Sequence, residues 1–134
     1  GENGLAIAAY QRAVSGNPRD AGSLSRLGRL YAQEKQGYDI ALALCGQAVE
    51  LDGGKAAHWY RLGLVQDLTQ DQEGAIQSLS ECLRLDPRQA EAALLLGRIF
   101  EQQARPGKAR KLYEKVLRYF PEHAPAQAAL AALS

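Results

Sequence analysis

The sequence predicts an all-α protein in which antiparallel helix pairs stack into an elongated solenoid. Its clearest sign is a Leu-Gly pair that recurs at 27–28, 62–63 and 96–97, at intervals of 35 and 34 residues. Within each interval, apolar residues follow the i, i+3, i+4, i+7 spacing of amphipathic helices. Self-similarity at this period is typical of stacked repeats, which offer an extended surface rather than an enclosed catalytic pocket.

Two sets of chain breakers set the ends of the expected helices. The residue before a proline is biased away from helical angles and Gly-Gly interrupts helices, which places strong breaks at Asn17-Pro18, Gly53-Gly54, Asp86-Pro87 and Phe120-Pro121. Weaker breaks fall at Gln36-Gly37, Gln70-Asp71 and Arg105-Pro106-Gly107. In chain order, the helices expected between these breaks span residues 3–15, 21–34, 38–51, 56–69, 72–85, 90–103, 107–119 and, as a short eighth, 124–133. Such short turns make successive helices antiparallel neighbours.

The pairing of helices follows from residues at fixed repeat positions. A glycine inside a helix costs about 1 kcal/mol relative to alanine, so its recurrence at 28, 63 and 97 indicates that the second helix of each pair approaches closely. We expect the residues that face these glycines to be Ala41, Ala75 and Ala109. We expect large side chains to fill the space at the ends of the interface, namely Tyr31, Trp59, Phe100 and Tyr113.

Together these positions resemble the tetratricopeptide repeat, whose pattern is Trp-x2-Leu-Gly-x2-Tyr, then Ala-x3-Phe, then Pro. The matching residues are Leu24, Leu27-Gly28, Tyr31, Ala41 and Cys45; Trp59, Leu62-Gly63, Gln66, Ala75, Leu79 and Pro87; and Ala93, Leu96-Gly97, Phe100, Ala109, Tyr113 and Pro121. Ala6, Tyr10 and Pro18 match the second half of an earlier copy. The resemblance implies a right-handed superhelix of helix pairs whose first helices line a concave groove. The departures are an extra residue near Lys35-Gln36, Gly53 in place of proline, and Gln66 in place of an aromatic residue.

We expect one domain over residues 1–134. Its parts are the second half of a truncated repeat at 3–20, full repeats at 21–55, 56–89 and 90–123, and a capping helix at 124–134. Helix 3–15 lacks its partner helix, which leaves Ile7, Tyr10 and Val14 poorly covered, and the chain contains no methionine. We therefore expect either that the natural protein continues upstream or that this end associates with another chain.

The composition argues against several classes of partner. Sixteen Lys and Arg against fifteen Asp and Glu give a net charge of +1, which is no reason to expect nucleic acid or an anionic membrane surface. No stretch approaches the roughly 18 apolar residues that span a bilayer, and the segment shows no secretory leader. Cys45 and Cys82 fall on inward-facing positions, where we expect buried thiols rather than a disulfide or a reactive site.

The first helices bear arginines on the side that should line the groove. Arg26 and Arg61 share one repeat position, and Arg29 and Arg98 share another. A guanidinium holds a carboxylate in two-pronged geometry, so such a ladder suits an acidic stretch or a chain terminus. The same side also holds Ser25, Gln33, Asp67 and Glu101. The alternative is an ordinary solvated face on which the arginines pair with these carboxylates.

The same side is also more apolar than helix pairing requires. Tyr60, Leu64 and Leu68 follow i, i+4, i+8 spacing, and Leu94 and Leu95 repeat the excess one unit later. A helix that is apolar on more than its core side is either buried or meets a partner. A partner helix or an extended peptide would use such a surface, whereas stacking onto the neighbouring repeat is the alternative explanation.

These residues predict a non-enzymatic protein-interaction scaffold that binds a peptide or helix of a partner in its groove. The carboxylate clamp of the resembled family is not expected, because the equivalent positions hold Ser25, Arg29, Arg61, Glu91 and Leu95. No cofactor or metal is expected, since His58 and His123 occupy different repeat positions and look like surface or boundary residues. The alternatives are self-association through helix 3–15 or the cap, and an accessory domain of a larger enzyme.

Overall fold

The computed structural model describes residues 2–34 and 37–133, and this part of the chain is all-α, without strands. Its helices are α1 (Glu2–Gly16), α2 (Ala21–Gln33), α3 (Tyr38–Leu51), α4 (Ala56–Leu68), α5 (Gln72–Leu85), α6 (Ala90–Gln102), α7 (Pro106–Tyr119) and α8 (Ala124–Ala132). The predicted helix ends differ from these by one residue at most. The fold prediction is confirmed, while the extra residue expected near Lys35-Gln36 lies outside the described residues.

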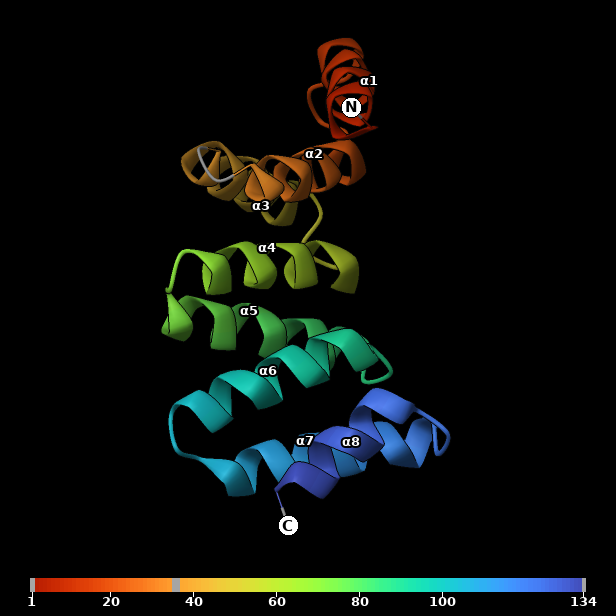
Figure 1. The fold of residues 1–134 in the computed structure, drawn as a ribbon. Helices are drawn as coiled ribbons and strands as arrows, with labels where there is room; N and C mark the ends of the chain where they lie inside the picture. The colour runs from red at the N-terminus through yellow and green to blue at the C-terminus, as the bar shows by residue number, and fades with distance from the viewer. Residues whose placement is uncertain (1, 35–36, 134) are drawn as a thin grey trace.

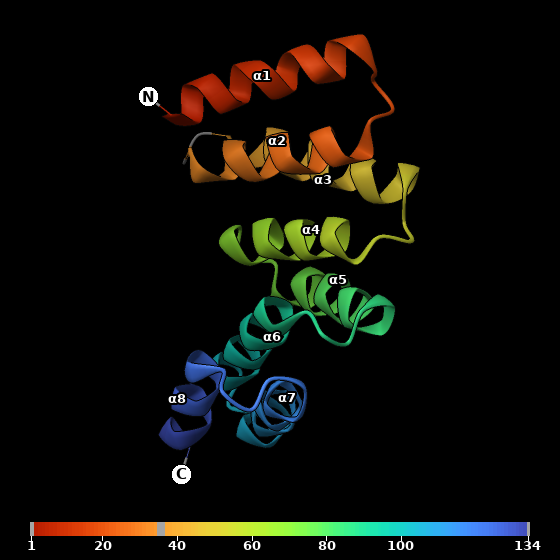
Figure 2. The same cartoon turned by 90° about the vertical axis from the view of Figure 1, so that its right-hand side faces the viewer.

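The helices stack in chain order along one column (Figure 1). Within it α2 packs on α3, α4 on α5 and α6 on α7, while α3 and α5 each contact the helix that follows. Helix α2 also touches α4 directly, so the first helices of the first two pairs are neighbours. At the lower end α8 folds back beside α7 (Figure 2). This arrangement places α2, α4 and α6 along one side of the stack.

The core is thickest where α5, α6 and α7 meet and thinnest at α1. A continuous cluster of buried side chains joins these three helices, including Leu79, Leu96, Ile99 and Tyr113. Helix α1, by contrast, contains no buried residue, and the side chain of Leu5 is 75% exposed. Each helix therefore gains its stability mainly from its neighbours in the stack, and α1 has a neighbour on one side only.

The recurring glycines do allow close packing, but the residue that each one faces differs from the prediction. A Cβ at Gly63 would lie 2.8 Å from Leu79 Cγ, and a Cβ at Gly28 would lie 2.6 Å from Cys45 Sγ. At Gly97 it would collide with the ring of Tyr113. The facing side chains are therefore those four residues after the predicted alanines. The alanines themselves are fully buried, and Ala41 meets Gly28 only through its carbonyl oxygen.

Two turns use a backbone conformation that is uncommon for residues other than glycine. Gln70, between α4 and α5, has φ 65°, and Ala104, between α6 and α7, has φ 58°. Both lie in the left-handed region, one repeat apart. Asp71 directly after the first turn caps α5 by accepting a hydrogen bond from the Gly74 amide at 3.0 Å. These turns bring each second helix back against its first.

Candidate partner-binding surface

A depression of about 330 Å³ at the α1 end gathers three of the four predicted arginines. Arg26 and Arg29 come from α2, and Arg61 comes from α4, one repeat further along the chain. The remaining walls are formed by Ala6, Tyr10, Leu30 and Gln33. We call the three guanidiniums the arginine site. The direct contact between α2 and α4 brings the side chains of two repeats into one place.

Arg61 is held in the arginine site by a buried polar network. Its Nη1 donates a hydrogen bond to Ser25 Oγ at 2.7 Å, and Ser25 Oγ lies 3.1 Å from His58 Nδ1. The other ring nitrogen of His58 lies 3.6 Å from a carboxylate oxygen of Asp52. Burial lowers the pKa of Arg61, and repulsion from Arg26 and Arg29 lowers it further.

This network corrects two of the sequence-based expectations. Ser25 was expected to line the groove but is fully buried beneath it, and His58 was expected near the surface but is 2% exposed. The Ser25, His58 and Asp52 side chains have the residue types of a hydrolytic triad. A buried serine hydroxyl that already contacts Arg61 gives a substrate no access, so the network acts as a support.

No carboxylate among the described residues neutralises the arginine site by an ion pair. None of its lining residues is acidic, and among the described residues none of its three arginines forms an ion pair. Asp20 is a carboxylate that interacts with Arg26 at longer range. Its pKa is lowered mainly by hydrogen bonds to Ser23 and to a smaller extent by the charge of Arg26. Asp67, an expected partner for the arginines, lies in a different depression.

A second depression, of about 400 Å³, lies further along the same side. Its apolar walls consist of Tyr60, Leu64, Leu94, Leu95, Pro125 and Ala129. We call it the apolar hollow. Exposed Glu91, Arg98 and Glu101 form its rim, and buried Tyr113, which also lines it, donates a hydrogen bond from its hydroxyl to Glu101. Burial, followed by the nearby charge of Glu91, raises the pKa of Tyr60.

The predicted apolar residues divide into three groups. Tyr60, Leu64 and Leu94 are partly buried and form the open walls of the apolar hollow. Leu95 was predicted to add exposed area but is 4% exposed, because it packs into the α5–α6–α7 core and reaches the hollow only at its floor. Leu68 is 44% exposed and does not line the hollow.

The predicted arginine ladder is likewise interrupted. Arg98 shares the rim of the apolar hollow with Glu91 and Glu101 and does not line the arginine site. A contact joins the two depressions, because the Arg29 guanidinium lies 6.0 Å from the centroid of the Tyr60 ring. The side formed by α2, α4 and α6 therefore has a cationic part and an apolar part that adjoin at Tyr60.

Sequence reasoning overlooked the contribution of α8 to the apolar hollow. Pro125 and Ala129 lie 34 residues after Glu91 and Leu95, so the repeat period itself would have placed them on the same side. It named Tyr10 only as a poorly covered residue of an incomplete helix pair and did not expect it to line the groove. The 34-residue period could therefore have predicted that α8 lines the groove, but sequence reasoning considered this helix only as a cap that covers the core.

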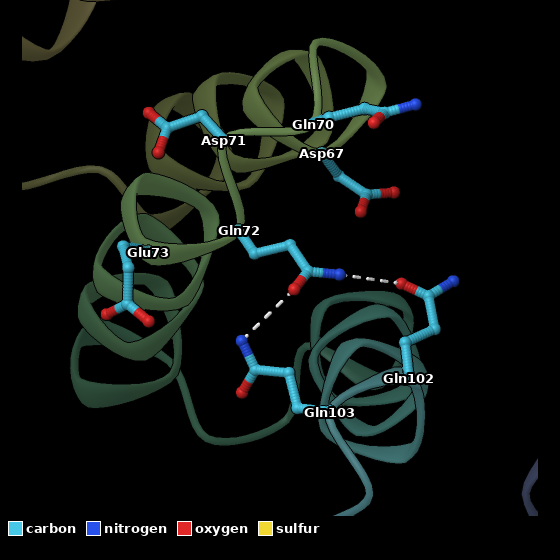
Figure 3. A pocket seen from close by; sticks show the side chains of 7 residues that line it. All are labelled: Asp67, Gln70, Asp71, Gln72, Glu73, Gln102 and Gln103. Atoms are coloured by element: carbon cyan, nitrogen blue, oxygen red, sulfur yellow. Dashed lines mark hydrogen bonds between the residues drawn. The ribbon is translucent and has the colours of Figure 1, made fainter.

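A third and larger depression, of about 750 Å³, lies between the α4–α5 turn and the end of α6 (Figure 3). It is lined by Asp67, Gln70, Asp71, Gln72, Glu73, Gln102 and Gln103. Gln72 bridges it by donating to Gln102 at 3.0 Å and accepting from Gln103 at 3.2 Å. Across residues 2–34 and 37–133, no group of three or more His, Cys, Asp or Glu side chains is arranged to hold a metal ion.

The two cysteines are buried and unpaired, as predicted. Burial raises the pKa of the Cys45 thiol to about 12 and that of Cys82 to about 11. Because the thiolate is the reactive form, neither residue is suited to nucleophilic or redox chemistry in the folded protein. In the described part of the chain, no helix combines the length and the apolar character that crossing a bilayer requires.

Comparisons with known proteins agree on one family. Two family models, both described as tetratricopeptide repeat, match residues 30–90 and 69–133. The chain is 29% identical over 111 residues to "Anaphase-promoting complex subunit 3" of Schizosaccharomyces pombe (strain 972 / ATCC 24843). That alignment covers 83% of this chain and 16% of the relative, so the chain spans 16% of the length of this curated protein.

Solved structures show the same architecture. The MamA protein matches 99% of this chain and 72% of its own chain, with a TM-score of 0.83 and 25% identity. A thermophilic tetratricopeptide repeat protein of Thermus thermophilus matches 97% of this chain and 73% of its own, with a TM-score of 0.85 and 22% identity. At 22% identity, the latter likeness shows the shared fold.

Proposed function

Because the chain belongs to the tetratricopeptide repeat family, whose domains are generally protein-interaction modules and typically non-catalytic, we propose that it binds a peptide or helix of a partner protein. The binding surface is the groove along α2, α4 and α6. The observation that supports this proposal is the adjoining of an arginine site and an apolar hollow on that one side. We also retain the division into repeats at 21–55, 56–89 and 90–123 as part of the proposal.

The groove residues offer two kinds of interaction. Guanidiniums form charge-assisted hydrogen bonds, which are shorter and stronger than neutral ones. Leu64, Leu94 and Tyr60 offer partly exposed apolar area, which stabilises a complex by about 25 cal/mol for each Å² removed from water. A groove of this kind accepts either an amphipathic helix or an extended segment.

A photoreactive side chain tests the location of binding. Tyr60 is replaced by benzoylphenylalanine, which keeps an aromatic ring where the two depressions adjoin, and the protein is irradiated in its native cells. We expect covalent adducts with a partner polypeptide. The matched control places the same group at Tyr119, a 42% exposed tyrosine at the end of α7 that lines neither depression. Equal adduct yields at the two positions would contradict the groove assignment.

Self-association through α1 is a second candidate function, and one observation favours it. Helix α1 has no buried residue, and Leu5 exposes 75% of its surface, so a second copy has apolar area to cover. Sedimentation over a concentration series measures this directly. A mass that rises with concentration supports it, and a constant monomer mass contradicts it.

A further inference from the structure

We propose that the groove selects a bipartite partner segment, with carboxylates at the arginine site and a large aliphatic side chain in the apolar hollow. This inference rests on the proposed function, because it specifies what the same groove binds. The occupant is a segment of a partner protein in which acidic residues lie within a few positions of an aliphatic residue. Neither depression alone requires the two parts to lie close together in the partner's sequence, whereas their contact at Tyr60 does.

Charge complementarity places the acidic part. Arg26, Arg29 and Arg61 converge on one depression that has no acidic lining residue. Their mutual repulsion is visible at Arg61, whose pKa is lowered by its two neighbours in addition to burial. A bound carboxylate would relieve this repulsion and accept two-pronged hydrogen bonds.

Arg61 is prepared for this role before any ligand arrives. Ser25 fixes one end of its guanidinium at 2.7 Å, and Ser25 in turn contacts buried His58. A side chain that is already ordered loses less conformational entropy on binding, which favours affinity. Arg26 and Arg29 are exposed, so they are free to adapt to the ligand.

The apolar hollow places the aliphatic part and excludes the acidic part. Its walls are leucine, tyrosine, proline and alanine side chains, and its rim holds two carboxylates against one guanidinium. Glu91 lines the hollow together with Tyr60, and its negative charge, after the larger effect of burial, raises the pKa of that tyrosine. A second carboxylate from a partner would be repelled there, whereas a neutral aliphatic side chain would not.

The contact between the two sites sets the spacing of the two parts. Arg29 lies 6.0 Å from the ring of Tyr60, which itself lines the apolar hollow. An extended peptide advances about 3.3 Å per residue, and side chains on one face repeat every second residue. The acidic and aliphatic residues of the partner are therefore expected within about two to four positions of each other.

Synthetic peptides of about 12 residues, which extend to about 40 Å, test the inference directly. One fluorescein-labelled peptide has two glutamates followed by two leucines. The second replaces the glutamates with lysine, and the third replaces the leucines with serine. By fluorescence anisotropy we expect the first peptide to bind at least about tenfold more tightly than either of the others, which corresponds to about 1.4 kcal/mol.

Matched charge reversals identify the site that selects the acidic part. The double variant Arg26→Glu and Arg29→Glu changes two exposed residues of the arginine site and should reverse the preference from the glutamate to the lysine peptide. The control Arg98→Glu alters an exposed arginine at the same repeat position as Arg29, but on the rim of the hollow. It should leave the preference for glutamate intact. Circular dichroism confirms that each variant is folded.

Each outcome separates this inference from the proposed function. Equal affinity for the glutamate and lysine peptides, an equal effect of the two charge-reversal variants, or binding of none of the peptides would overturn the bipartite inference. The photoreactive Tyr60 variant decides independently whether a partner occupies the groove. If that variant forms adducts while the peptides show no charge preference, the groove binds a partner of another chemistry. If the Tyr60 variant forms no adducts and the peptides show no charge preference, the groove is not the binding surface.

Discussion

At the scale of single residues, the repeating glycines show how a missing side chain determines helix pairing. Each glycine accepts a side chain from the opposite helix, and the three accepted side chains differ in size: Cys45, Leu79 and Tyr113. The largest of them is fixed at its far end, because the Tyr113 hydroxyl donates to Glu101. The third pair therefore has the least freedom to adjust to an added methyl group.

A glycine that faces a side chain and a glycine with open space beside it should respond oppositely to substitution by alanine. Gly97→Ala places a Cβ into the Tyr113 ring, and overpacking of this kind should lower the free energy of unfolding by about 2 kcal/mol. Gly46→Ala is the control, because Gly46 lies within α3 with no neighbour near its Cβ position. It should raise the free energy of unfolding by about 1 kcal/mol. Urea denaturation measures both, and equal effects would contradict the packing role of Gly97.

The sequence could predict the importance of these glycines but not the residues that they face. Recurrence at one register position is visible without a structure, and it indicated close approach correctly. The facing residue depends on how far one helix is shifted along its partner, which is set by the turn between them. Two of those turns contain Gln70 and Ala104 in the left-handed region. Neither glutamine nor alanine is typical of that conformation, so the sequence did not predict it.

At the scale of helices, one polar network links two repeats. Ser25 belongs to α2, while His58 and Arg61 belong to α4, and Asp52 lies in the turn before α4. Burial, with the charges of Arg61 and Lys55, lowers the pKa of His58, against the opposing effect of Asp52. The folded protein therefore holds this imidazole neutral where an unfolded chain would begin to protonate it.

This linkage gives the pH dependence of stability a definite sign. The stabilising effect of neutral His58 is complete above the ordinary histidine pKa of 6.5. As the pH falls through that value towards the lower folded-state pKa, the unfolded chain takes up a proton first, so the stability decreases. Urea titrations between about pH 7.5 and 5 should show this loss. His58→Gln should flatten the dependence, and an unchanged slope in that variant would exclude His58 as its source.

The helices themselves were predictable, whereas the network between them was not. Every predicted helix end is correct to within one residue, and proline and glycine breakers located most of them because they act through local backbone geometry. The exception is the Gln70-Asp71 break, which contains neither residue type. Ser25 lies 33 residues before His58 and 36 before Arg61, and it meets them only because α2 touches α4. Because the sequence does not show that contact, both Ser25 and Arg61 were expected to line the groove. In the structure Ser25 is buried and Arg61 is partly exposed.

At the scale of the whole molecule, the two ends of the stack differ from its middle. Helix α6 has seven buried residues and lies between neighbours, whereas α1 has none and α8 has only Ala126. The groove is polarised along the same axis, with the arginine site against α1 and the apolar hollow against α8. The repeat period predicted an arginine ladder along the whole groove, because a period describes which positions recur and not how the end helices close the groove.

The uneven burial predicts a gradient of local stability, which is also a test of self-association. Amide hydrogen exchange should be fastest in α1 and slowest in α6, with protection factors at least about tenfold apart, because a helix without buried side chains opens without disturbing the core. Mass spectrometry of peptides from both helices measures the difference at low protein concentration. If a second copy covers α1, its protection should rise with concentration while that of α6 stays constant. Uniform protection at every concentration would contradict the weak attachment of α1, and a concentration-independent gradient would rule out that a second copy covers this helix.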